Sequence, residues 1–349
     1  MSGSECDIAL EPLLGKTLPE LEAVALACGM KRFAGKQLAD WLYRKRVTTF
    51  DEMSNLSLAA RQLLAQQFCV GRSLPVAEAV SEDGTKKYLF TVNGTNTGGV
   101  HVEAVYIPAD ARATLCVSTQ AGCRMGCRFC LTGTLGFKGN LTAADILNQI
   151  LYFPDLTNIV VMGEGEPMDN VEPVLRVIEI LTASYGLAWS PSRVTVSTVG
   201  AGEGLERFLK ESECNLAISL HNPFADERAS IMPAERLRPL RDVLQTVSRY
   251  DFRHQRRLSF EYIVWGGLND TMRHAGELLR LLRPFAPQCR LNLIRFHEGV
   301  SVPFPATDEQ AMLRLQEYMN NNGITTTIRR SRGEDILAAC GMLVNSLEN

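Results

Sequence analysis

The stretch TLCVSTQAGCRMGCRFC, residues 114–130, joins a strand-like segment to a loop with three closely spaced cysteines, Cys123, Cys127 and Cys130. Three thiolates on one short loop can bind a metal centre and leave one coordination position to another molecule. An iron–sulfur cube takes four ligands, so one iron would stay open to a small molecule. On spacing alone, a structural zinc site with Cys116 as fourth ligand is the alternative.

After residue 110, strand-like segments alternate along the chain with segments of helical periodicity. Strand-like segments occupy residues 114–118, 158–162, 193–197, 216–220, 260–264 and 290–294, and helical patterns lie near 143–152, 171–184, 202–210, 236–249, 271–284 and 307–322. Six such units predict an α/β fold, a parallel sheet covered by helices in the form of either an open, partial (βα)6 barrel or a closed one. Chemistry in such folds lies at the carboxyl ends of the strands, and the cysteine loop follows the first strand.

The N-terminal part has a different pattern. Residues 1–80 show helical periodicity, and residues 81–110 contain two alternating segments joined by a Gly/Asn-rich loop, which predicts a β-hairpin. We therefore expect a helical accessory domain at 1–80, a hairpin connector at 81–110 and a barrel at 111–349. Residues 334–343 also have a helical pattern, so Cys340 is expected on a short C-terminal helix.

The composition of the chain is typical of an ordinary globular enzyme. Of its 349 residues, 46% are hydrophobic and 21% are charged, and the net charge is -3. With no signal-like start and no apolar run long enough for a bilayer, we expect a cytoplasmic protein whose ten cysteines are mostly reduced. Basic clusters such as Arg44-Lys45-Arg46 and the group of Lys31, Arg32 and Lys36 are either RNA contacts or solvated helix ends.

The cysteine spacing, with Phe129 before the last cysteine, resembles the signature of the radical S-adenosylmethionine superfamily. From about residue 12 to about residue 343 the chain resembles the RlmN/Cfr family of RNA adenosine methyltransferases, and more closely its RlmN branch. The motifs that carry the resemblance are FAGKQL (33–38), WLY (41–43), DGTKK (83–87), VEAVYIP (102–108), GEP (165–167), LAISLH (216–221) and RGEDILAACG (332–341).

This resemblance implies a [4Fe-4S] cluster on Cys123, Cys127 and Cys130, with S-adenosylmethionine on the fourth iron. The positions that it assigns to cosubstrate binding are Gly165, Glu166, Ser197, Ser219, Leu220, His221 and His297. From the residues alone, simpler interpretations stay open, because Gly-Glu is common at strand ends, Ser197 could cap a helix and His221 could be a satisfied loop histidine.

Three positions depart from the family. His297 stands where RlmN-type proteins carry an asparagine, Arg295 replaces the usual proline, and Glu164 replaces the usual methionine. A neutral histidine still donates and accepts one hydrogen bond, so we keep His297 as a cosubstrate contact. These differences allow a divergent member with another RNA target.

The resemblance also implies three catalytic residues. Cys340 would carry a methyl group as S-methylcysteine, Cys116 would be the resolving thiol, and Glu103 the proton acceptor. Without the resemblance, Cys340 is interpreted as an inert buried cysteine and Glu103 as a solvent-facing strand residue. A first S-adenosylmethionine would methylate Cys340 and a second would generate the radical, and release would leave a transient Cys116–Cys340 disulfide.

The expected function is methylation of carbon 2 of an adenosine in large-subunit (23S) rRNA, with tRNA as a further candidate substrate. The expected partners are RNA and an electron donor for the cluster, without a membrane. The alternatives are methylation at carbon 8, as in Cfr, a radical enzyme on another RNA or a protein, and a zinc-stabilised RNA-binding protein without catalysis.

Overall fold

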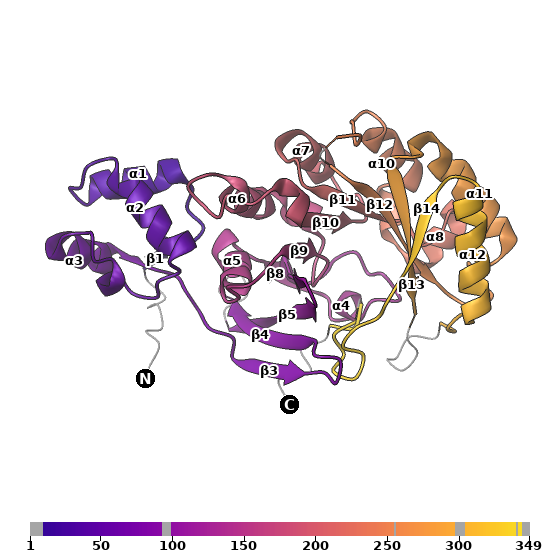
Figure 1. Cartoon of the computed structure of the whole chain (residues 1–349), viewed down its shortest axis with the longest axis horizontal. Helices are drawn as coiled ribbons and strands as arrows, with labels where there is room; N and C mark the ends of the chain where they lie inside the picture. The colour runs from indigo at the N-terminus through magenta and orange to yellow at the C-terminus, as the bar shows by residue number, and fades with distance from the viewer. Residues whose placement is uncertain (1–9, 93–98, 255, 297–303, 340, 344–349) are drawn as a thin grey trace.

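A computed structural model of the chain describes residues 10–92, 99–254, 256–296, 304–339 and 341–343. Two predicted site residues, His297 and Cys340, lie outside these ranges. Figure 1 shows a cluster of helices at the N-terminal end, a twisted sheet that crosses the molecule, and helices along the outer side of its far half. None of the described helices combines the length and the apolar character that a membrane span requires.

The main sheet has ten described strands in the order β14-β13-β12-β11-β10-β9-β6-β5-β4-β3. The part from β6 to β14 is parallel. Its strands are β6 (Arg112–Cys116), β9 (Asn158–Val161), β10 (Val194–Thr198), β11 (Asn215–Ser219), β12 (Leu258–Val264), β13 (Cys289–Arg295) and β14 (Thr325–Arg329). All six predicted strands are present. The sequence analysis missed β14, because its run of three threonines gives no apolar alternation.

Helices connect the successive parallel strands and form the outer layer (Figure 1). The predicted ones are α5 (Ala143–Leu151), α6 (Val171–Thr182), α7 (Gly204–Glu211), α10 (Leu240–Val247), α11 (Met272–Leu282) and α12 (Glu309–Asn321). In α6 one apolar face is buried, where Val174, Val177, Ile178 and Leu181 pack into the core, whereas α5 is buried on all sides. The short helices α4 (Leu131–Thr134), α8 (Ala225–Ile231) and α9 (Ala234–Leu237) were not predicted.

The predicted hairpin belongs to the same sheet and lies near one of its edges. Its strands are β4 (Lys86–Val92) and β5 (Val100–Ala109), and β5 pairs antiparallel with β6. A further strand, β3 (Ala77–Val80), pairs with β4, although it lies in the range predicted for the helical domain. The hairpin is therefore continuous with the barrel sheet.

The N-terminal cluster consists of α1 (Leu18–Ala27), α2 (Ala34–Ala39) with one following π-helical turn (Asp40–Arg44), a 3-10 turn (Phe50–Glu52) and α3 (Leu58–Gln67). Two short strands, β1 (Glu11–Pro12) and β2 (Phe68–Cys69), pair across its base. Leu21, Leu38, Leu42 and Leu64 belong to one buried core shared with the barrel.

Arg44 and Arg46 hold this helical cluster on the barrel. Arg44 Nε donates to the carbonyl of Gly186 at 2.9 Å, and Arg46 Nη1 donates to the carbonyl of Phe153 at 2.8 Å. These carbonyls lie in the segments that follow α6 and α5. Arg44 and Arg46 are therefore domain contacts and not simply solvated helix ends, and contact of this cluster with RNA stays a prediction.

The prediction of a short C-terminal helix at residues 334–343 is wrong. Residues 334–337 form a turn, and the described residues from 338 to 343 contain no helix. Positive φ angles at Gly333 (64°), Leu337 (53°) and Gly341 (81°) are incompatible with a continuous right-handed helix. The side chain of Asp335 contacts the turn between β3 and β4, where it accepts a hydrogen bond from Ser81 Oγ at 2.6 Å.

Candidate active site

The cysteine loop is framed by a small hairpin after the first parallel strand. Strands β7 (Gln120–Gly122) and β8 (Phe137–Asn140) pair antiparallel and bracket residues 123–136. Gly122 has a φ of 69°, and a Cβ at this position would lie 1.8 Å from the carbonyl oxygen of Gly136. Only glycine therefore allows the chain to enter the loop this way.

The three loop thiols lie in a largely apolar environment. Cys127 packs with Ile231, Met232 and Trp265. Burial raises the pKa of Cys123 to about 12 and raises the pKa values of Cys127 and Cys130 as well, so unbound thiolates are disfavoured. In the described part of the chain, no three His, Cys, Asp or Glu side chains form a group that could hold a single metal ion.

The C-terminal segment lies against this loop. Leu131 N donates to the carbonyl of Gly341 at 2.8 Å, and Thr132 Oγ1 donates to the carbonyl of Leu343 at 3.1 Å. Cys116, the last residue of β6, packs against the buried cluster formed by Val105, Ala338 and Leu343. The residues on both sides of Cys340 are therefore held beside the loop and beside Cys116.

Glu103 lies inside the sheet, with no exposed surface. Its Oε1 is 2.9 Å from Lys87 Nζ, and Lys87 is equally buried. The solvent-facing interpretation of Glu103 is therefore wrong. The role of Lys87 was not predicted from the sequence. The signal for it was the register of the hairpin: Glu103 lies opposite Leu89, and Lys87, two residues from Leu89, points to the same face.

Gly165 and Glu166 follow the second parallel strand. A Cβ on Gly165, whose φ is 98°, would lie 2.5 Å from Gln120 Cβ, so the backbone needs glycine here. The buried carboxylate of Glu166 accepts hydrogen bonds from Val199 N and Met168 N, both at 3.0 Å. Burial raises the pKa of Glu166 to about 7. This side chain thereby joins the ends of β9 and β10.

The ends of β10 and β11 place Ser197 and Ser219 side by side, with their hydroxyl oxygens 3.5 Å apart. Buried Arg228 holds the chain that follows, because its guanidinium donates to the carbonyls of Ser219 and Leu220, both at 2.9 Å. Arg228 itself pairs with Glu235. Sequence reasoning missed this arginine, which lies on the unpredicted helix α8.

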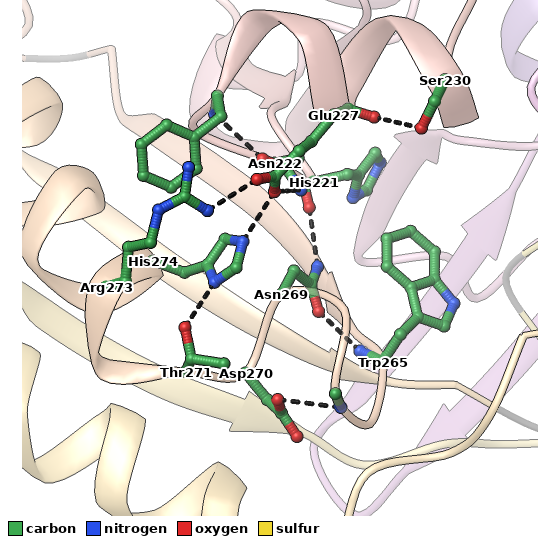
Figure 2. Close-up of polar contacts among 12 residues, drawn as sticks. His221, Asn222, Glu227, Ser230, Trp265, Asn269, Asp270, Thr271, Arg273 and His274 are labelled. Carbon is green, nitrogen blue, oxygen red and sulfur yellow. Dashed lines mark hydrogen bonds and ion pairs between the residues drawn. The ribbon is translucent and has the colours of Figure 1, made fainter.

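His221 is fixed in a left-handed conformation with a φ of 57°. Its Nδ1 accepts a hydrogen bond from Ile263 N at 3.1 Å. Its carbonyl accepts one from Asn269 Nδ2 at 2.8 Å, as Figure 2 shows. Its ring meets the edge of Phe129 in the cysteine loop, with centroids 5.0 Å apart. Burial, together with nearby Arg228, lowers the pKa of His221 to about 3, so the imidazole is neutral.

Figure 2 also shows the polar network that supports this loop. The carboxylate of Glu227 accepts hydrogen bonds from Arg273 Nη1 at 2.6 Å and Asn222 Nδ2 at 3.0 Å, and it lies 2.8 Å from His274 Nε2. These contacts tie the turn after β11 to the start of α11. None of these side chains was predicted, since Arg273 and His274 lie 46 and 47 positions from Glu227 along the chain.

Arg295, one of the three positions expected to depart from the related family, has a structural partner. It ends β13 and pairs with Glu309 on α12, with Nη2 and Oε1 2.6 Å apart. An ion pair between strand and helix therefore holds this side chain. His297, two residues later, lies outside the described residues.

Comparison with known proteins agrees with this arrangement. The family described as the ribosomal RNA large subunit methyltransferase N-terminal domain matches residues 12–70, and the radical SAM superfamily matches residues 117–282. The probable dual-specificity RNA methyltransferase RlmN of Bacteroides thetaiotaomicron is 54% identical over 95% of this chain and 95% of its own. The chain belongs to the RlmN family of radical SAM RNA methyltransferases.

Two further relatives extend this RlmN assignment. The dual-specificity RNA methyltransferase RlmN of Halorhodospira halophila is 40% identical over 97% of this chain and 94% of its own length. The crystal structure of a radical SAM methyltransferase from Sphaerobacter thermophilus matches with a TM-score of 0.87 and 36% identity, covering 95% of this chain and 99% of that one. Membership of this enzyme family replaces the zinc-stabilised, non-catalytic alternative.

The RlmN family implies a [4Fe-4S] cluster and S-adenosylmethionine. The donor set fits the cluster, since three thiols lie on one loop, and the backbone at Met125 and Gly133 partly offsets the rise that burial causes in the pKa values of Cys123 and Cys130. Metal binding would offset the cost that burial places on their thiolates.

Proposed function

We propose that this chain methylates carbon 2 of an adenosine in large-subunit (23S) rRNA, and an adenosine of tRNA as a second substrate. The matched N-terminal domain and the dual-specificity names of the relatives support both substrates. The observation that carries the proposal is the hydrogen bond between Leu131 N and Gly341 O at 2.8 Å. It holds the neighbours of Cys340 against the loop that would bind the cluster.

The ligands are those expected from the sequence. Cys123, Cys127 and Cys130 would hold the cluster, and the strand-end residues would line the cosubstrate: Gly165, Glu166, Ser197, Ser219, Leu220 and His221. His297, outside the described residues, is a further expected cosubstrate contact. When bound, the cluster and two molecules of S-adenosylmethionine per turnover would supply the radical chemistry that an unactivated ring carbon requires. An electron donor for the cluster is then a required partner.

The side chains around the loop would handle the methyl group and the proton. Cys340 would carry the methyl as S-methylcysteine and become linked to the adenine. Glu103 would then accept the ring proton, and the buried ammonium of Lys87 would stabilise its charged form before transfer. The thiolate of Cys116 would attack the sulfur of Cys340, and the bond from that sulfur to the transferred carbon would break. The released carbon would take up a proton to become the methyl group of the product, and a cellular reductant would reopen the resulting disulfide.

The RNA would contact the N-terminal helical cluster through a patch at the start of α2. Lys31 and Lys36 are exposed there, and Phe33 between them keeps 59% of its surface accessible. An exposed aromatic ring among cations can stack on a base while the cations follow the phosphates. The target adenosine must leave its stack to reach the strand ends of the barrel. We place this activity in the cytoplasm, without a membrane partner.

Mass spectrometry of rRNA and tRNA nucleosides, from cells with and without the gene, tests this proposal. The expected result is a 2-methyladenosine signal in both RNA pools that disappears with the gene and returns with the unaltered gene. An 8-methyladenosine signal would instead assign the chain to the carbon-8 reaction. Identical adenosine modifications in both strains would overturn the proposed function.

A further inference from the structure

Glu164 is a buried carboxyl group with no role in the chemistry proposed above. It follows β9, two residues before Glu166, and only 1% of its surface is exposed. Burial raises the pKa of Glu164 to about 7. A charge-capable side chain rarely occupies such a position unless it is bound to specific partners.

One partner of Glu164 is the backbone of Glu103. The ladder between β5 and β6 ends at the pair Val105 and Cys116, so Glu103 lies beyond the last residue pair on that edge of β5. Its N–H donates to Glu164 Oε1 at 2.9 Å. Its carbonyl accepts a hydrogen bond from Ser118 Oγ at 2.6 Å, and the same hydroxyl accepts one from Glu164 N at 2.8 Å.

The other partner of Glu164 is the beginning of the cysteine loop. Gly122 N, one residue before Cys123, donates to Glu164 Oε2 at 3.3 Å. The backbone carbonyl of Glu164 accepts hydrogen bonds from Thr119 N at 2.8 Å and from Gln120 N at 3.2 Å. A single residue therefore joins the strand that carries Glu103 to the segment that carries the first loop cysteine.

We propose that Glu164 is a positioning residue, which sets the strand position of Glu103 relative to the cysteine loop and thereby aligns Glu103 for proton transfer. This inference rests on the role of Glu103 in the proposed function. A carboxylate suits the position because it offers two acceptor oxygens to two backbone donors. Glutamine keeps one acceptor but turns an NH₂ group toward the second N–H, and alanine keeps neither acceptor.

The test uses the cluster-containing protein and an RNA substrate in single-turnover reactions. Glu164→Ala is compared with Glu164→Gln and with Ser118→Ala, which removes the hydroxyl that holds the Glu103 carbonyl. Glu317→Gln, an exposed position on α12, is the matched control. The measurements are iron content, cleavage of S-adenosylmethionine, RNA covalently attached to protein, and released methylated RNA.

We expect all variants to keep the iron content and the cosubstrate cleavage of the unaltered protein. Glu164→Ala should slow product release by about 10- to 100-fold, the effect of a misplaced catalytic group, and protein–RNA adduct should accumulate. Glu164→Gln should fall between Glu164→Ala and the unaltered protein, and Ser118→Ala should also accumulate adduct. A purely structural role would not produce this graded effect on a single step.

Release at the unaltered rate in Glu164→Ala and Ser118→Ala would overturn the inference and leave the proposed function intact. Loss of iron and of cosubstrate cleavage together in these variants would also overturn it, because Glu164 would then only support the loop. If the unaltered protein forms neither adduct nor methylated RNA, the proposed function itself fails, and the inference fails with it.

Discussion

The backbone N–H of Leu131 donates to the carbonyl of Gly341 over 2.8 Å, so the residue after Cys130 is bound to the residue after Cys340. A second bond, from Thr132 Oγ1 to the carbonyl of Leu343 at 3.1 Å, joins residues 211 positions apart. The short helix α4 thus anchors the C-terminal segment at the cysteine loop. Both bonds use backbone carbonyls, so substitution of the Cys340 side chain should leave the anchor in place.

Replacement of Cys340 by alanine should separate the two parts of the reaction. We expect Cys340→Ala to assemble its cluster and cleave S-adenosylmethionine, because the three cluster cysteines lie on another segment, but to transfer no methyl to RNA. Iron analysis, detection of 5′-deoxyadenosine and nucleoside mass spectrometry give the three measurements. Methylated RNA from purified Cys340→Ala protein would contradict the scheme.

Replacement of Cys116 by alanine should block release instead of transfer. Cys116 packs against the cluster of Val105, Ala338 and Leu343, and the last two residues belong to the segment on either side of Cys340. We expect Cys116→Ala to accumulate protein crosslinked to RNA, visible as a shifted band on a denaturing gel that ribonuclease removes. Cys289→Ala, at a buried cysteine on β13, is the control and should accumulate no adduct. A Cys116→Ala protein with normal turnover would exclude a resolving role.

Removal of Lys87, the buried partner of the proposed base Glu103, should lower the stability of the protein. Lys87→Met leaves a carboxylate without its partner inside the sheet, which costs about 3–5 kcal/mol when one member of a buried pair is removed. Urea unfolding followed by circular dichroism measures this loss. Because Lys87→Met/Glu103→Gln removes both charges, it should recover much of the stability, and a double variant as unstable as Lys87→Met would contradict this account.

Two groups of basic residues in the N-terminal region should behave differently. Arg44→Ala removes hydrogen bonds to the barrel, so it should lower the melting temperature and expose the domain junction to proteolysis, without changing the salt dependence of RNA binding. Lys31→Ala/Lys36→Ala should reduce the slope of log K against log salt by about 1 for each phosphate that the protein no longer neutralises. Anisotropy titrations at several salt concentrations distinguish the two. An equal change in slope for both variants would favour the RNA-contact interpretation of Arg44.

The raised pKa of Glu166 should appear in the pH dependence of stability. Since burial raises its pKa to about 7 from the ordinary value of 4.5, the folded state holds a proton that the unfolded state has released between these values. The contribution of this proton to the free energy of unfolding is therefore largest at low pH. It is lost as the pH rises toward 7, by at most about 1.4 kcal/mol per pH unit. Glu166→Gln should flatten the fall in melting temperature between about pH 4.5 and 7, the interval between the unfolded and folded pKa values, and Glu317→Gln should not. An unchanged slope in Glu166→Gln would show that Glu166 is ionised throughout.

Local sequence was sufficient for the regular elements and for the loop. Apolar alternation and helical periodicity depend on neighbouring residues, so the six predicted parallel strands and their helices are present. The same local signal failed where side chains do not alternate, as in the threonines of β14. It also failed where positive φ angles break a helical pattern, as at Gly333 and Leu337.

Only the tertiary structure decided which charged and polar groups meet. Lys87 and Glu103 pair across the hairpin, Glu164 reaches a strand 61 residues earlier, and Arg44 binds a carbonyl 142 residues later. No periodicity encodes such contacts, because they depend on how separate elements pack and on which backbone groups this packing leaves without partners. The sequence by itself determined the three-cysteine loop and its place after the first parallel strand, whereas folding determined what surrounds that loop.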